Sequence, residues 1–124
     1  MRVFSVEEAN ALLPFLRKAL AHIAEEQRAL RRLAPEIQPA QERAQFGGGS
    51  EFGAVFLRHL IRFHQYAQEI ASHGVVVKDY ELGLCDFPFY LHGQLVYLCW
   101  KLGEARIHWW HEPDAGFAGR QPLD

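Results

Sequence analysis

The sequence lacks the features that define several large classes of protein. Only two of its 124 residues are cysteines, Cys85 and Cys99, and no second pair stands near them, so a four-cysteine zinc knuckle cannot be built. No apolar run approaches the roughly 18 residues of a membrane span, and the first residues carry no secretory signal. The 13 basic and 15 acidic side chains leave a net charge of −2, without the basic excess typical of nucleic-acid binding. We therefore expect a cytoplasmic protein that binds neither membranes nor nucleic acid, with both cysteines acting as small buried hydrophobes.

The composition changes near Gly74. Residues 1–73 hold nine basic and eight acidic side chains and are rich in the helix formers Ala, Leu, Glu and Arg. Residues 74–124 hold four basic and seven acidic side chains, all three tryptophans and 9 of the 16 aromatics. We predict an α+β fold in a single domain, 1–124, with a helical hairpin over 1–73 and an antiparallel sheet and C-terminal loop over 74–124.

A short N-terminal helix is predicted first. Ser5 and Glu8 have the spacing of a capping box, which satisfies two free backbone N–H groups at a helix start. Pro14 lacks the N–H that an interior helical position needs, so this helix should end near Leu12 and Pro14 should lie in the first turn of a longer one. A single kinked helix is the alternative.

The hairpin follows from apolar residues at alternating steps of three and four. This coiled-coil spacing runs over 13–30, and we expect the helix to stop near Leu33 because two prolines follow. Residues 35–50 end in a glycine run and predict the hairpin tip. The same spacing recurs over 56–70, and Gly74 suits a left-handed helix cap. The two long helices should pack antiparallel.

After Gly74 the apolar period falls to two, which predicts a small antiparallel meander of three to four strands over 75–77, 84–91, 95–100 and 106–111. Pro88 requires a sheet edge or a bulge. The glycine- and proline-rich tail is expected to be irregular.

Two-residue turns at His92-Gly93 and Leu102-Gly103 would fix the faces of this sheet. Cys99 would then pair with Asp86 on one side and with Arg106 on the other. The resulting apolar face, with Phe87, Leu98 and Ile107, should cover the helices. In this register Asp86 and His111 lie on opposite faces.

Acidic and histidine side chains are frequent in the second half of the sequence. Because these side chains bind metals, a divalent metal ion is the cofactor that the sequence suggests. Carboxylate oxygens and neutral imidazoles from Asp86, Glu104 and His111 could hold such an ion. No spacing marks a dedicated metal motif, and capping and surface polarity explain the same residues. Catalysis by either cysteine is not expected, since burial disfavours a thiolate.

Several short strings give the sequence a family resemblance. They include Phe4-Ser5-Val6-Glu7-Glu8-Ala9-Asn10, Asp86-Phe87-Pro88, Val96-Tyr97-Leu98-Cys99-Trp100, Leu102-Gly103-Glu104, Trp110-His111 and Gly116-Phe117-Ala118-Gly119-Arg120-Gln121-Pro122-Leu123. On these strings the chain resembles DUF2203, a bacterial family of unknown function. The resemblance implies no activity, but it includes the polar residues Lys78, Asp79, Asp86, Glu104, His111 and Arg120.

Two function hypotheses follow. The first is a dimeric interaction or scaffolding module, or a small-ligand-binding module, with Phe15, Phe52 and Val55 at a homodimer interface. A small anionic ligand would be bound by residues drawn from Lys78, Asp79, Asp86, Arg106, Trp110 and Arg120. The alternative is a small metal-dependent or acid–base enzyme that uses Asp86, Glu104 and His111.

Overall fold

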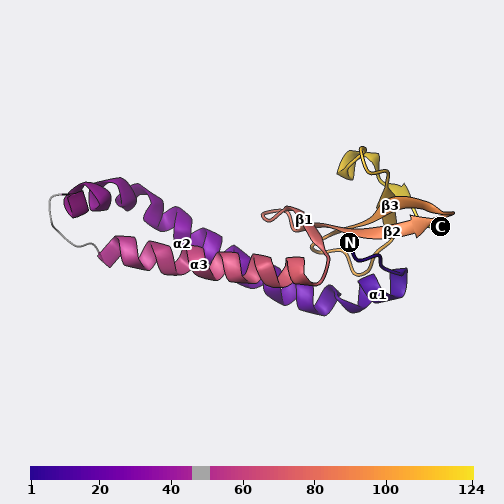
Figure 1. The fold of residues 1–124 in the computed structure, drawn as a ribbon, viewed down its shortest axis with the longest axis horizontal. Coiled ribbons are helices and arrows are strands. Elements are labelled where there is room, and N and C mark those ends of the chain that lie inside the picture. The colour runs from indigo at the N-terminus through magenta and orange to yellow at the C-terminus, as the bar shows by residue number, and fades with distance from the viewer. Residues whose placement is uncertain (46–50) are drawn as a thin grey trace.

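The structure is a computed structural model of the chain. It describes the backbone of residues 1–45 and 51–124 and the side chains of residues 1–35 and 53–124. Three helices precede an antiparallel sheet, which confirms the α+β architecture (Figure 1). No helix among the described residues is long and apolar enough to cross a bilayer. The helices are α1 (Val6–Ala11), α2 (Leu13–Gln45) and α3 (Glu51–Ser72).

The N-terminal helix boundaries agree with the prediction. The Ser5 hydroxyl accepts the Glu8 N–H at 3.0 Å, and the Glu8 carboxylate accepts the Ser5 N–H at 2.9 Å. These two bonds satisfy donors that a helix start leaves free. Helix α1 ends at Ala11 and α2 begins at Leu13, so Pro14 lies in the first turn of α2.

Helix α2 is longer than predicted. It does not stop near Leu33 but continues through Pro35 and Pro39 to Gln45. A proline inside a helix costs about 3 kcal/mol, which is a penalty and not a prohibition. The predicted loop over 35–50 is therefore wrong for 35–45, whereas the glycine run at 47–49 lies outside the described residues.

Helix α3 returns alongside α2 and completes the antiparallel hairpin (Figure 1). It ends as predicted, because Gly74 adopts a left-handed conformation with φ +87°. The N–H groups of His73 and Gly74 donate to Ile70 and Ala71, which satisfies carbonyls of the last turn.

The sheet has five antiparallel strands in sequence order, one more than the upper limit of the prediction. The extra strand lies in the tail, which was expected to be irregular. A short 3₁₀ helix, η1 (Phe117–Gly119), precedes this strand. The strands are β1 (Val76–Asp79), β2 (Leu84–Leu91), β3 (Gln94–Lys101), β4 (Trp109–His111) and β5 (Gln121–Pro122).

The β2–β3 hairpin has the predicted register. His92 and Gly93 both have positive φ, 52° and 81°, which is the signature of a tight two-residue turn. Asp86 consequently pairs with Cys99. Pro88 lies where β2 has no strand on its other side, and its carbonyl accepts the Phe4 N–H at 2.8 Å.

The β3–β4 connection corrects the predicted register. The expected two-residue turn is instead a longer segment, 102–108, and Cys99 pairs with Trp109 rather than Arg106. Helical side chains hold this segment: the Ile107 N–H donates to Asn10 Oδ1 at 2.8 Å, and Arg17 donates to Ala105 O at 2.9 Å. The shift is three residues, an odd number, so every β4 side chain changes face. Trp110 therefore packs against the core, and His111 lies on the face that carries Asp86.

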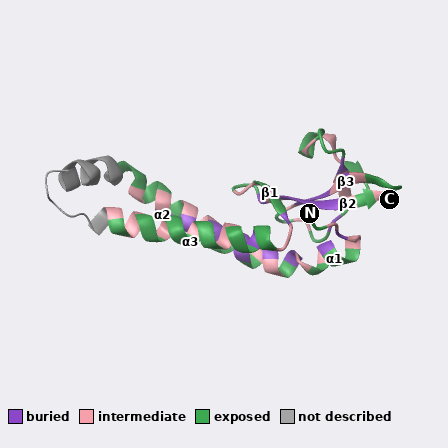
Figure 2. Cartoon of the chain, viewed as in Figure 1, coloured by how far each residue is buried: buried purple, intermediate pink, exposed green. Residues whose placement is uncertain are grey.

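The hydrophobic core lies between the other face of the sheet and the base of the hairpin. Phe87 and Trp100 are fully buried there with Leu16 and Leu20 of α2 and Ile70 of α3. Buried residues concentrate at this junction, whereas the hairpin beyond it is mostly exposed or half-buried (Figure 2). The prediction that the hairpin packs on the sheet therefore holds only for its base.

Candidate metal centre

Three polar side chains meet on the sheet face turned away from α1. Asp86 comes from β2, Cys99 from β3 and His111 from β4. One ligand atom of each lies within 4.8 Å of the other two. All three residues are almost completely buried, with 2%, 1% and 2% of their surfaces exposed. A buried group of this kind requires a partner for each polar atom.

The hydrogen bond of the His111 ring determines where its lone pair points. Nδ1 lies 2.7 Å from the carbonyl oxygen of Glu112. Since a carbonyl oxygen can only accept, Nδ1 carries the proton and donates it. In neutral imidazole the other nitrogen, Nε2, is then an unprotonated acceptor. This orientation is common in metal-binding histidines.

Nε2 faces the carboxylate of Asp86, with Oδ2 at 3.0 Å. The contact does not have hydrogen-bond geometry, and neither atom has a hydrogen-bond partner among the described residues. Two acceptors at this distance repel each other unless a positive species lies between them. A proton on either His111 or Asp86, or a bound cation, must therefore lie between the two atoms.

Cys99 adds a sulfur atom to the same cluster. Burial raises the pKa of its thiol to about 11, although the guanidinium of Arg120 acts in the opposite direction. At neutral pH the free thiol is therefore protonated and a poor nucleophile. A divalent cation that binds sulfur displaces this proton and supplies the missing charge itself.

The donor set fits a borderline metal such as Zn²⁺. Tetrahedral zinc takes thiolate, imidazole and carboxylate ligands at about 2.0–2.3 Å, which places ligand atoms about 3.3–3.8 Å apart. Asp86 Oδ2 and His111 Nε2 lie 3.0 Å apart, slightly closer than this spacing, and one ligand atom of each of the three residues lies within 4.8 Å of the others. Three protein ligands leave a fourth position open, as in catalytic rather than structural zinc sites.

A cavity of about 320 Å³ adjoins the cluster and is large enough for a small molecule. Its wall combines the three buried cluster residues with the segment after β4, which returns across this side of the sheet (Figure 1). Lys78 and Asp114 are the remaining charged residues in the wall.

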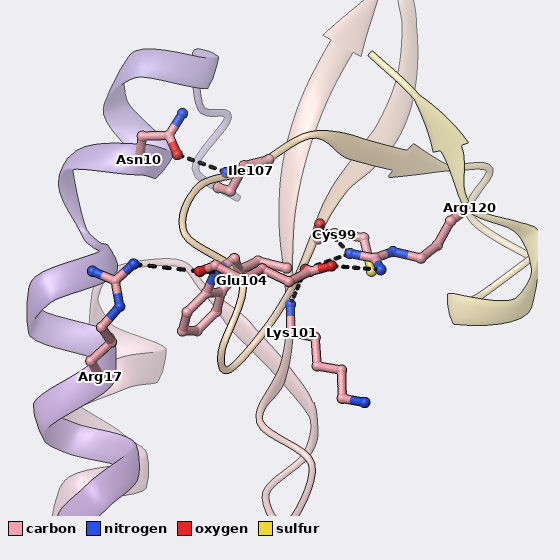
Figure 3. A network of polar contacts seen from close by, with 8 residues as sticks. Asn10, Arg17, Cys99, Lys101, Glu104, Ile107 and Arg120 are labelled. Atoms are coloured by element: carbon pink, nitrogen blue, oxygen red, sulfur yellow. Dashed lines mark hydrogen bonds and ion pairs between the residues drawn. The ribbon is translucent and has the colours of Figure 1, made fainter. Parts of the chain in front are cut away.

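Glu104 does not join the cluster, contrary to the predicted set of Asp86, Glu104 and His111. Its carboxylate is bound by both terminal nitrogens of Arg120, at 2.7 and 2.9 Å, and by the Lys101 N–H at 2.7 Å (Figure 3). Partial burial alone would raise the pKa of Glu104, but the hydrogen bonds from Arg120 and Lys101 outweigh it and hold the pKa below 4.5.

Arg120 fastens the tail to the site rather than pointing into open solvent. Besides Glu104, it donates to the backbone carbonyl of Cys99 at 3.2 Å, and its guanidinium lies against the rings of Phe117 and Trp109. The hydrogen bonds to Glu104 raise the pKa of Arg120, although its partial burial opposes them. Arg120 thus holds the segment that walls the cavity close to β3.

The other predicted ligand residues are dispersed. Asp79 Oδ1 accepts the Leu82 N–H at 2.9 Å and stabilises the β1–β2 turn. Arg106 is exposed beside Asn10 and Arg17, away from the buried cluster. Trp110 packs against the hydrophobic core. Of the six candidates, Asp86 and Lys78 line the cavity.

The sequence analysis does not place Cys99 in the cluster, because it expects both cysteines to be small buried hydrophobes. The predicted register of the hairpin nevertheless pairs Asp86 with Cys99, as the structure does, and this pairing could have identified Cys99 as a neighbour of Asp86. His111 was assigned to the wrong face because the β3–β4 connection was taken as a two-residue turn.

Fold and site together define a small α+β protein whose β-meander buries an Asp–Cys–His cluster on the face opposite its helical hairpin. The chain belongs to the DUF2203 family, described as an uncharacterized conserved protein, and the match covers residues 2–123. No curated protein and no solved structure matches the chain.

Proposed function

We propose that the protein binds one divalent transition metal ion, of the Zn²⁺ class, through Asp86, Cys99 and His111. The observation that carries this proposal is the contact between His111 Nε2 and Asp86 Oδ2. It brings two acceptors together in a buried site, with a cysteine sulfur beside them. A metal ion would bind all three side chains at once, whereas a proton shared by Asp86 and His111 would involve only two of them.

The adjoining cavity favours a working site over a purely structural one. A structural zinc site has four protein ligands, whereas this cluster offers three and adjoins about 320 Å³ of open space. A bound metal would supply Lewis-acid chemistry at that position. Asp86 and Cys99 would set its charge, and the Glu112 carbonyl would keep the His111 ring in place. Glu104, in contrast, serves to anchor Arg120.

The test is metal loading of the full chain without an affinity tag. Purified protein is stripped with a chelator, dialysed against Zn²⁺ or Co²⁺, and analysed for bound metal. We expect one ion per chain and, with Co²⁺, the near-ultraviolet charge-transfer band of a thiolate ligand. Cys99→Ser and His111→Gln should each abolish stoichiometric binding.

Two matched variants separate ligation from folding. Cys85→Ser removes the other buried cysteine, whose side chain lies on the core face, and His108→Gln removes an exposed histidine. Both should retain the metal and the thiolate band. Wild-type protein that binds no metal, or loading that survives in both Cys99→Ser and His111→Gln, would overturn the proposal and leave a protonated Asp86–His111 pair.

A homodimeric interaction module is the second candidate, and α3 carries the observation that favours it. Leu57, Leu60 and Ile61 are 53%, 44% and 47% exposed along one helix, and neighbouring exposed apolar side chains of this kind are found at protein–protein interfaces. Val55 lies half-buried nearby, and the side chain of Phe52 is outside the described residues. Phe15 contacts His73 at 4.6 Å between ring centroids and packs against the core instead.

Light scattering tests the dimer. Wild-type protein should give twice the chain mass of 14.3 kDa, and Leu60→Glu should give the single-chain mass while keeping its helicity. A single-chain mass for the wild type removes this candidate and leaves the metal proposal unaffected.

A further inference from the structure

The cavity beside the metal centre contains charges that the cluster itself does not use. Lys78 lies on β1 at the irregularity between Val77 and Asp79, and it lines the cavity together with Asp86, Cys99 and His111. The side chain of Lys78 has no carboxylate within ion-pair distance among the described residues. Asp114, on the returning segment, is likewise without an ion-pair partner in that part of the chain.

The charge balance of the loaded site makes Lys78 the main attraction for a ligand. Asp86 and the thiolate of Cys99 each carry one negative charge, which together neutralise a divalent ion. Lys78 then adds one positive charge at the cavity wall, which would attract an anion into the space beside the metal. Asp114 adds a negative charge to the same wall and repels a ligand with two negative charges more strongly than a ligand with one.

The rest of the wall is apolar. Leu84, Pro113, Ala115 and Phe117 line the cavity together with the charged groups. A site that combines a few placed polar groups with apolar surface binds small organic molecules rather than bare inorganic ions. The volume of about 320 Å³ is at the lower end of such sites.

We infer that the site takes a small monocarboxylate, whose carboxylate pairs with Lys78 at the metal's open position and whose apolar body lies against Leu84 and Phe117. This inference rests on the proposed metal site and names the class of ligand that the site accepts. Phosphate is disfavoured by Asp114 and gains nothing from the apolar wall. A neutral amide of the same shape gains the apolar contacts but not the ion pair.

The test titrates the zinc-loaded full chain with benzoate, benzamide and inorganic phosphate in a calorimeter. Benzoate should bind about fivefold more tightly than benzamide, the difference that one partly exposed ion pair provides. Phosphate should bind more weakly than benzoate. Lys78→Met should remove the preference for benzoate over benzamide, and Lys78→Arg should retain it.

Controls keep this outcome separate from that of the metal proposal. Lys18→Met removes an exposed lysine of α2 and should bind benzoate like the wild type. The metal content of Lys78→Met is measured first and should equal that of the wild type. If metal loads normally but benzoate and benzamide bind equally, or if phosphate binds more tightly than benzoate, this inference fails and the metal site stands. If the wild-type protein binds no metal, both the metal proposal and this inference fail.

Discussion

The hairpin arm and the sheet end of this molecule are held together in different ways. We define the arm as residues 24–35 of α2 with 53–62 of α3, and the sheet end as residues 1–23 with 70–124. Within the described arm only Glu26 and Ala29 are buried, and its large apolar residues Leu57, Leu60 and Ile61 face water. The sheet end buries Phe87, Trp100 and three polar side chains completely or nearly so.

This difference shows where a chain of 124 residues concentrates its stability. Apolar burial supplies most of the free energy of folding, and here it lies at the base of the hairpin. The arm adds helix-to-helix contacts but little core. The polar cluster sits on strands of the buried sheet end, and a pre-organised site requires support from such regular elements.

The largest loss of stability is expected from a substitution in the core of the sheet end. Phe87 is fully buried and packs edge-on against Phe4, with ring centroids 5.3 Å apart. Phe87→Ala should lower the free energy of unfolding by about 3–5 kcal/mol, since it removes buried surface and leaves a cavity. Urea titration followed by tryptophan fluorescence measures the loss.

The matched change in the arm is Leu57→Ala, at a residue that is 53% exposed. It should alter the free energy of unfolding by no more than about 0.5 kcal/mol, as is usual for exposed positions. Equal losses for Phe87→Ala and Leu57→Ala would contradict the contrast between the two regions.

An intermediate loss of stability is expected when the ion pair between Glu104 and Arg120 is removed. Glu104→Gln keeps the side-chain shape but removes the charge from the bonds to Arg120 and Lys101. Losing charge-assisted hydrogen bonds at this half-buried position should cost about 1–3 kcal/mol. Because Arg120 also holds the Cys99 carbonyl, the variant should bind metal more weakly.

The same variant has a defined pH dependence. The pKa of Glu104 in the folded protein is lower than the 4.5 of the free side chain. The carboxylate therefore adds stability above pH 4.5, and this contribution disappears as the pH falls through the folded pKa. The stability gap between wild type and Glu104→Gln should be constant near neutrality and close in acid. A gap that widens on acidification would reject the assigned role of Glu104.

Local patterns predicted most of the fold. The capping box at Ser5, the break before Pro14 and the turn at His92-Gly93 were all correct, because each depends on neighbours within a few residues. The end of α2 was wrong, because the local penalty of Pro35 decides a helix boundary only when nothing else supports the helix.

The site was predicted only in part, and one loop explains the failure. Asp86 and Cys99 were paired correctly, because a two-residue turn fixes the register between their strands. His111 depends on the segment 102–108, which Asn10 and Arg17 hold from positions about 90 residues away in the chain. No local signal records such contacts. The register between two strands can change by an odd number of residues without any change in composition, and the change between β3 and β4 places His111 on the face that carries Asp86 and Cys99.

A smaller effect than that at Glu104 is expected at a polar link between the two helices of the described arm. Glu26 is 8% exposed, and its carboxylate lies 2.6 Å from Nδ1 of His59 on α3. Glu26→Ala removes this bond between the two helices and should cost about 1 kcal/mol. If the arm opens without the sheet end, amide exchange should become faster in 24–35 and 53–62, while amides of β2 and β3 keep their protection. The metal content should also be unchanged. Faster exchange throughout β2 and β3 would show that the arm and the sheet end open together. In that case the two regions would differ in burial but would unfold as one cooperative unit.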